Sequence, residues 1–124
     1  MLEHHALTER IIGLAIEVHR QVGPGLMESV YAECLCLELT ASGIAFQSEA
    51  TVPVVYKGMV IPLGFRADIL VADAIILEIK AVTTLLQVHE AQLLTYLRMS
   101  QIRVGLLMNF HAARLKDGLR RLIV

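Results

Sequence analysis

The chain has 124 residues and a formal net charge of −1, and 56% of its residues are hydrophobic while 19% are charged. This length suits a single domain, taken here as residues 1–124, rather than a multidomain protein. No apolar run approaches the ~20 residues that a membrane helix needs, and the N-terminus lacks the basic opening and apolar core of a signal peptide. We therefore expect a cytoplasmic protein with no membrane partner.

The hydrophobic content is high for a chain of this size. The share of 56% exceeds the roughly 45–50% that is usual even when glycine is counted as apolar. One small core leaves part of this apolar surface uncovered, and self-association would bury it. We expect a homo-oligomer, most simply a two-fold dimer.

Two amphipathic helices are expected in the first third of the chain. Apolar residues recur at helical spacing from Leu7 to Val22, and Gly23-Pro24-Gly25 then breaks the helix. A second helix is expected from Leu26 to Ala41. The residues of this helix that are expected to face inward are Met27, Val30, Tyr31, Cys34 and Leu35.

The hydrophobic period then changes to two, which predicts strands. Phe46–Tyr56 and Val60–Phe65 flank a turn and are expected to form an antiparallel hairpin. Arg66–Val71 and Ile75–Val82 follow as extended segments. They form either two more strands or the continuation of one long strand and its partner.

Helical spacing returns at Leu85–Met99, with Val88, Ala91, Leu94 and Leu97 in contact positions. Residues 103–109 are expected to form a short buried strand, and residues 112–124 a closing helix or a final strand. The element order predicts an α/β fold, in the broad sense that includes α+β, with a central mixed sheet flanked by helices.

A candidate metal site lies on the predicted strands. Glu78 and Lys80 are two residues apart in an apolar segment, so their side chains share one face. Asp68 in the adjoining segment would lie beside Glu78 across the pairing. Charges in an apolar strand are costly unless they are paired or ligated, which argues against a role in solubility alone. Such oxygen ligands suit Mg²⁺ or Mn²⁺, and the Ile79 carbonyl is the expected third ligand.

These residue types point to phosphodiester hydrolysis. Lys80 could stabilise hydroxide or the negative charge that develops on the phosphate, while a metal ion lowers the pKa of water. On the next helix, His89, Gln92 and Tyr96 share one face, from which Gln92 can contact the phosphate or the attacking water. The alternative is that Gln92 faces solvent and Tyr96 fills the core.

The segment Gly25-Leu26-Met27-Glu28-Ser29-Val30-Tyr31 resembles the pattern that names the GxxExxY family, which is placed in the PD-(D/E)xK nuclease superfamily. The resemblance covers essentially the whole chain. Further matching segments are Leu7-Thr8-Glu9, Glu17-Val18-His19, Arg66-Ala67-Asp68, Glu78-Ile79-Lys80, Gln92 with Tyr96, and Gly105 to Phe110. Ala67 stands where the superfamily's name has proline.

The resemblance implies a PD-(D/E)xK nuclease-like core in α-β-β-β-α-β order. It implies that Asp68 and Glu78 are the core metal ligands, that Glu28 is a helical acid that helps to bind metal, and that Lys80 is the catalytic lysine. It also implies that Gln92 and Tyr96 form the accessory motif of exonuclease-like members. Tyr31 either packs beneath Glu28 or hydrogen-bonds a carboxylate.

Basic residues are concentrated near the C-terminus, where residues 98–124 carry six basic side chains against one acidic side chain. The expected nucleic-acid contacts are Arg66, Arg98, Arg103, Arg114 and Lys116; a solvated basic helix end is the alternative. The expected function is a Mg²⁺- or Mn²⁺-dependent nuclease, with DNA favoured over RNA. The alternatives are a non-catalytic binding or scaffolding module and a hydrolase of smaller phosphate compounds.

Overall fold

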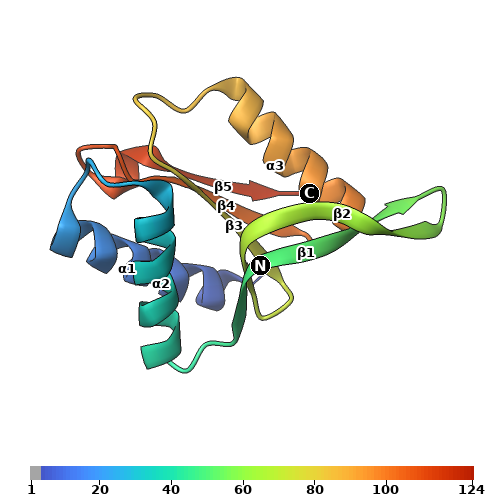
Figure 1. The fold of residues 1–124 in the computed structure, drawn as a ribbon, viewed down its shortest axis with the longest axis horizontal. Coiled ribbons are helices and arrows are strands. Elements are labelled where there is room, and N and C mark those ends of the chain that lie inside the picture. Colours follow the sequence, from blue (N-terminus) through green and yellow to red (C-terminus); the bar gives the residue numbers. More distant parts are fainter. Residues whose placement is uncertain (1–3) are drawn as a thin grey trace.

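The computed structural model describes residues 4–124, except for the side chain of Leu63, and its centre is a five-stranded sheet with helices on both faces (Figure 1). In chain order the elements are α1 (His5–Val22), α2 (Glu28–Ala41), β1 (Phe46–Tyr56), β2 (Met59–Val71), β3 (Ile75–Lys80), α3 (Gln87–Ser100), β4 (Val104–Asn109), the 3-10 helix η1 (Leu115–Gly118) and β5 (Leu119–Ile123). No described helix is long and apolar enough to cross a membrane.

The sheet is mixed, as the element order predicts. Its strand order is β1-β2-β3-β4-β5; β3 and β4 are parallel, and the other neighbours are antiparallel. A parallel pair needs a crossover connection, which α3 supplies. Two open alternatives are thereby decided: residues 59–71 form one long strand, and the chain closes with a strand that follows a short 3-10 helix.

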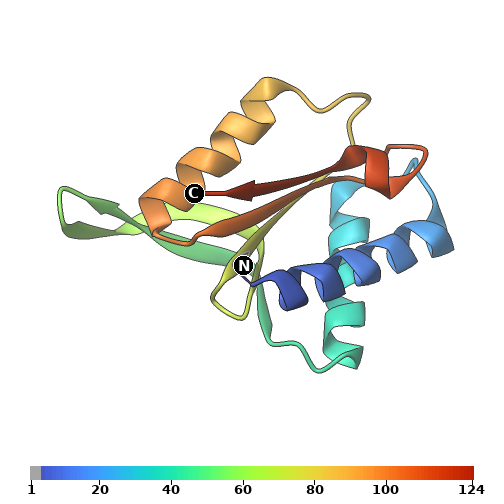
Figure 2. The same ribbon diagram turned by 180° about the vertical axis from the view of Figure 1, so that it is seen from behind.

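The two faces of the sheet carry different layers. Helices α1 and α2 cover one face and α3 covers the other, as the two opposite views show (Figures 1 and 2). Leu77 and Ile79 belong to the core cluster beneath α1 and α2, whereas Ile76 belongs to the cluster beneath α3. Since strand side chains alternate between faces, Glu78 and Lys80 lie on the α3 face.

The buried faces of α2 and α3 differ from those predicted. Met27 is 71% exposed and Val88 is 63% exposed, and Val30 and Ala91 are exposed as well. Met27 precedes the first residue of α2 and has an extended backbone, so the helical face begins later than predicted. The residues of these helices that are buried are Tyr31, Leu35, Leu39, Leu93 and Leu97.

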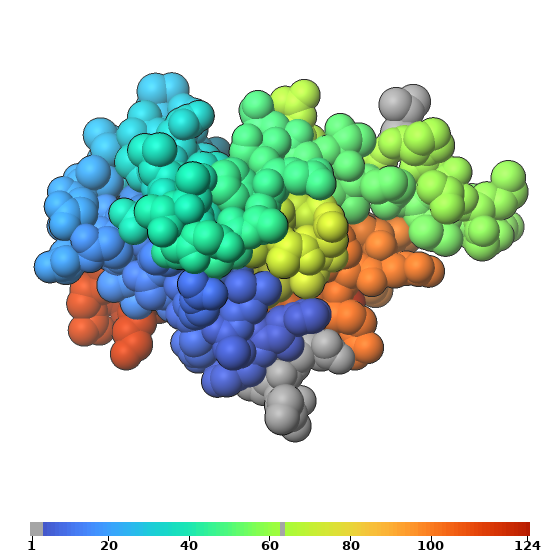
Figure 3. All heavy atoms as spheres, turned by 90° about the horizontal axis from the view of Figure 1, so that it is seen from below, coloured from blue at the N-terminus to red at the C-terminus, as the bar shows by residue number. Residues whose placement is uncertain are grey.

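Strands β1 and β2 form a hairpin whose tip projects from the body of the molecule (Figure 3). Its register shifts between Val52 and Val54. A Cβ atom at Gly64 would lie 1.8 Å from the Val52 carbonyl oxygen, so the close approach of the two strands there requires glycine. Tyr56 and Met59 at the tip are exposed.

Candidate metal and catalytic site

Strand β3 extends beyond its pairing with β2. The antiparallel ladder between these strands runs from Val71 opposite Ile75 to Ile69 opposite Leu77. On its other edge, β3 stays paired with β4 as far as Lys80. The backbone groups of β3 beyond Leu77 on the side facing β2 therefore need partners other than a strand.

Two carboxylates supply these partners. Asp68 Oδ2 accepts a hydrogen bond from the Ile79 N–H at 2.7 Å, and Glu28 Oε2 accepts one from the Ala81 N–H at 3.1 Å. Successive residues of a strand direct their backbone groups to opposite edges. The Lys80 carbonyl accepts the Phe110 N–H on the β4 side at 2.9 Å, so the Ile79 carbonyl lies on the open edge with Asp68.

Glu78 is a buried acid next to a second acid. Its side chain is 8% exposed. Burial raises the pKa of Glu78 to about 9. The hydrogen bond that its protonated carboxyl donates to Asp68 and the negative charge of Asp68 act in the same direction, although Lys80 acts in the opposite direction. Glu78 is therefore protonated at neutral pH when no cation is present. A divalent cation between the two carboxylates would remove the repulsion that holds this proton.

The donor set fits a hard divalent cation. Asp68 and Glu78 provide two carboxylates and Ile79 one carbonyl, and Mg²⁺ commonly takes one or two carboxylates and completes its octahedron with water. Residues 4–124 contain no group of three histidine, cysteine or acidic side chains placed to hold one ion. Glu28 lines the same pocket of about 240 Å³ as Asp68 and Ile79.

The α3 face brings further predicted residues to the carboxylates. Burial and then the charges of Glu78 and Asp68 raise the pKa of Tyr96, while a hydrogen bond with Gln92 lowers it. The Tyr96 ring stacks on Phe65, with centroids 3.9 Å apart and planes inclined by 8°. Tyr96 and Gln92 therefore lie beside the candidate metal site, on the face that carries Glu78.

Tyr31 acts by packing. Its hydroxyl donates to the Gly23 carbonyl at 2.5 Å and accepts from the Leu26 N–H at 3.1 Å, and its ring stacks on Phe110 at 4.6 Å. Both hydroxyl bonds go to backbone atoms, and neither goes to a carboxylate. Tyr31 fixes the turn before α2 and thereby the start of the helix that carries Glu28.

Asn109 supports the candidate site, a role that the sequence did not predict. It is 4% exposed and lies opposite Lys80 in the β3–β4 ladder. Its Oδ1 accepts the Val82 N–H at 3.0 Å, and its Nδ2 donates to the Val82 carbonyl at 2.9 Å. This pair of bonds holds the segment that follows Lys80. The available signal was a polar residue that ends an otherwise apolar strand.

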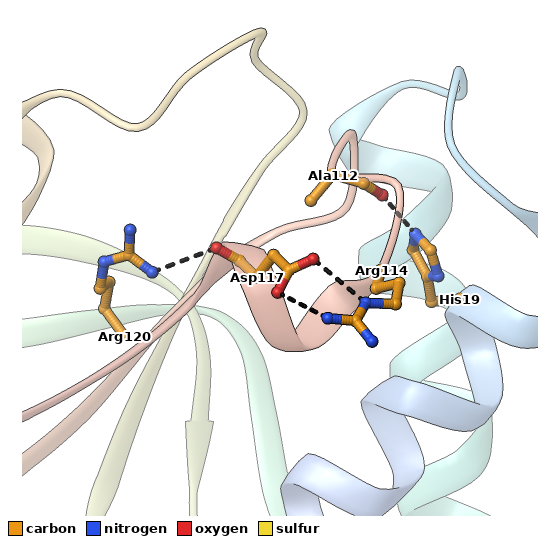
Figure 4. A network of polar contacts seen from close by, with 5 residues as sticks. All are labelled: His19, Ala112, Arg114, Asp117 and Arg120. Atoms are coloured by element: carbon orange, nitrogen blue, oxygen red, sulfur yellow. Dashed lines mark hydrogen bonds and ion pairs between the residues drawn. The ribbon is translucent and has the colours of Figure 1, made fainter.

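The expected nucleic-acid contacts divide into two groups. Arg114 and Lys116 follow β4, whose last residue lies opposite Lys80. Arg114 forms an ion pair with Asp117, with 3.2 Å between Nε and Oδ2. Figure 4 shows this pair close to the hydrogen bond between His19 and the Ala112 carbonyl. Arg103 precedes β4 at the other end of the ladder, roughly 20 Å from Asn109 at about 3.3 Å per residue.

The other two predicted contacts also lie apart from each other. Arg98 is in the last turn of α3, which leads into β4 at the end of the sheet far from Lys80. Arg66 forms an exposed ion pair with Glu49 at 3.6 Å, and Glu49 lines the acidic pocket together with Asp68. Arg66 is thus placed beside the acidic pocket, whereas Arg114 and Lys116 follow the end of β4 that lies opposite Lys80.

Comparison with known families supports this description of the fold. The sequence model of the PD-(D/E)XK nuclease superfamily matches residues 5–122. Neither the comparison with curated proteins nor the comparison with solved structures gave a match. The match covers every helix and nearly every strand residue of the fold, including the residues of the candidate metal site.

Proposed function

Because the chain belongs to the PD-(D/E)XK nuclease superfamily, we propose that it is a metal-dependent nuclease that hydrolyses phosphodiester bonds of nucleic acid. The observation that carries the proposal is the pair formed by Asp68 and Glu78 at the open edge of β3. Lys80 shares the face of Glu78, so an ammonium group and two carboxylates serve one site.

Each residue has a role in the proposed reaction. When bound, Mg²⁺ or Mn²⁺ supplies Lewis-acid stabilisation of the phosphodiester and lowers the pKa of water. Asp68, Glu78 and the Ile79 carbonyl would hold the ion, and Glu28 would help to bind it. Lys80 orients the attacking water and stabilises the charge that develops on the phosphate oxygens. Gln92 contacts the phosphate or that water.

We propose DNA as the preferred substrate, with Arg66, Arg114 and Lys116 as contacts to its phosphates and Arg98 and Arg103 as more distant ones. We further propose that the protein acts in the cytoplasm as a homo-oligomer. The exposed apolar residues at the tip of the β1–β2 hairpin support self-association, because burying them would remove apolar surface from water.

The test is cleavage of labelled single- and double-stranded DNA and RNA in Mg²⁺ or Mn²⁺. We expect Asp68→Asn and Lys80→Ala each to lower the rate by on the order of 10²–10³, the usual loss when one electrostatic stabiliser is removed. Lys57→Ala, in the exposed turn of the hairpin, is the matched control and keeps the wild-type rate.

Two results would count against the nuclease. One is a wild-type protein that cuts no substrate in either metal, and the other is an Asp68→Asn variant that cuts as fast as wild type. A wild-type protein that binds Mg²⁺ in a calorimetric titration and binds DNA, yet leaves it intact, would instead support a non-catalytic binding module.

A further inference from the structure

A second pocket lies along α3, next to the candidate metal site. It has a volume of about 390 Å³ and shares no lining residue with the acidic pocket; its walls are Val88, His89, Ala91, Gln92, Thr95 and Tyr96. These residues recur at spacings of three and four, so they form one stripe along the helix. Tyr96 joins the two regions, because it lines this pocket and also lies within the electrostatic influence of Glu78 and Asp68.

The aromatic wall of this pocket is held in place by the fold. Phe65, in β2, stacks against the Tyr96 ring at 3.9 Å, so the ring has little freedom left to lose when a ligand binds. Tyr96 remains partly exposed despite this contact. A fixed and partly exposed aromatic ring is the type of surface on which a nucleobase stacks.

The polar groups of the pocket match the edge of a base. The exposed Gln92 amide can both donate and accept, and Thr95 adds a hydroxyl. His89 Nδ1 accepts the Leu86 N–H at 3.0 Å, which leaves Nε2 to carry the ring proton as a donor. None of the six lining residues is a lysine or an arginine, so the pocket suits an uncharged ring better than a phosphate group.

We propose that the pocket along α3 receives an unpaired base from a nucleotide next to the scissile phosphate, and that the protein therefore selects single-stranded nucleic acid. A base inside an intact duplex is stacked and paired, and it would have to leave the helix before it could lie on Tyr96. The inference rests on the proposed function, because it assumes that the phosphate beside this base is the one held at Asp68 and Glu78.

The test uses single-stranded oligodeoxynucleotides that carry the fluorescent base 2-aminopurine at one position at a time. They are bound in Mg²⁺ to the Lys80→Ala variant, so that the strand is not consumed. We expect quenching at one position. In this background, Tyr96→Leu should remove the quenching and weaken single-strand binding by about tenfold, whereas Tyr96→Phe should keep both. Leu37→Ala, at an exposed position of α2, is the control and should stay within twofold.

Quenching that survives Tyr96→Leu, or an equal loss of duplex and single-strand binding, would overturn the proposal. If Tyr96→Leu fails to fold, Thr95→Ala on the exposed side of the pocket replaces it and should weaken single-strand binding severalfold but leave duplex binding unchanged. Position-specific quenching in a wild-type protein that cuts no substrate would support the base pocket and contradict the proposed nuclease function. Cleavage of duplex DNA as fast as single strands would support the nuclease function and contradict the base pocket.

Discussion

The two edges of β3 are built differently although the same six residues form both. Toward β4, all six residues are paired in parallel, from Ile75 opposite Val104 to Lys80 opposite Asn109. Toward β2, three residues are paired and the ladder ends at Leu77. The closed edge uses backbone partners throughout, whereas the open edge uses carboxylates. The candidate site lies where regular pairing stops.

This difference shows how one strand can serve stability and function together. The closed edge needs only apolar side chains and a continuous ladder. The open edge holds Glu78 buried against Asp68, an arrangement that is unfavourable unless a proton or a cation relieves it. Changes to the closed edge should therefore alter the stability of the fold, and changes to the open edge should alter its response to pH and metal.

The largest effect of removing an apolar side chain is expected on the closed edge. Leu106, on β4 opposite Leu77, is fully buried. Leu106→Ala leaves a cavity and should lower the free energy of unfolding by about 2–5 kcal/mol, as measured by urea denaturation. Leu37→Ala, at a position that is 68% exposed, should change it by less than about 0.5 kcal/mol. Loss of Mg²⁺ affinity in folded Leu106→Ala protein would contradict the separation of the two edges.

The open edge should make the metal-free protein sensitive to pH. The pKa of Glu78 is raised to about 9, so between its ordinary value of 4.5 and about 9 the folded protein holds a proton that the unfolded chain has lost. The contribution of Glu78 to the free energy of unfolding is therefore greatest below pH 4.5. It falls as the pH rises toward 9, by at most about 1.4 kcal/mol per pH unit. Glu78→Gln should remove this contribution.

Urea denaturation of both proteins across this pH range measures the difference, since all other titrating groups are shared. Saturating Mg²⁺ should flatten the wild-type profile, because the ion takes the place of the proton. At pH 7 the binding of Mg²⁺ should release about one proton, visible as a binding enthalpy that depends on the ionisation enthalpy of the buffer. Parallel profiles for wild type and Glu78→Gln would refute the assignment.

Much of this arrangement could be predicted from the sequence. The period of two placed Glu78 and Lys80 on one face, and the short link to Asp68 placed the two acids side by side. The early end of the β2–β3 ladder could not be predicted, because it depends on side chains that replace backbone partners. The inward positions assigned to Met27 and Val88 were wrong because apolar spacing does not show where a helix begins or which stripe meets the sheet.

A smaller effect is expected at the end of the closed edge. Asn109→Ala removes both side-chain bonds to Val82 and the bond that Asn109 Oδ1 accepts from the His111 N–H. It leaves partly buried backbone groups unpaired, which should lower the free energy of unfolding by about 1–3 kcal/mol. Hydrogen exchange should become faster at Val82 and in the segment after it, while β1 and β2 stay protected. The control Gln87→Ala, at an exposed position, should leave exchange unchanged. Uniformly faster exchange would indicate a general loss of stability instead.

The smallest effect should separate the two ends of the sheet through the salt dependence of DNA binding. Each neutralised phosphate contributes about −0.9 to the slope of log affinity against log salt concentration for duplex DNA, and about −0.7 for single strands. Because Arg114 and Lys116 follow the end of β4 that lies opposite Lys80, Arg114→Gln and Lys116→Gln together should make the slope shallower by about 1–2. Arg98→Gln with Arg103→Gln removes the same charge at the far end, so it should change the slope less. Equal changes in slope would mean that DNA extends along the whole length of β3 rather than contacting only the end that carries Lys80.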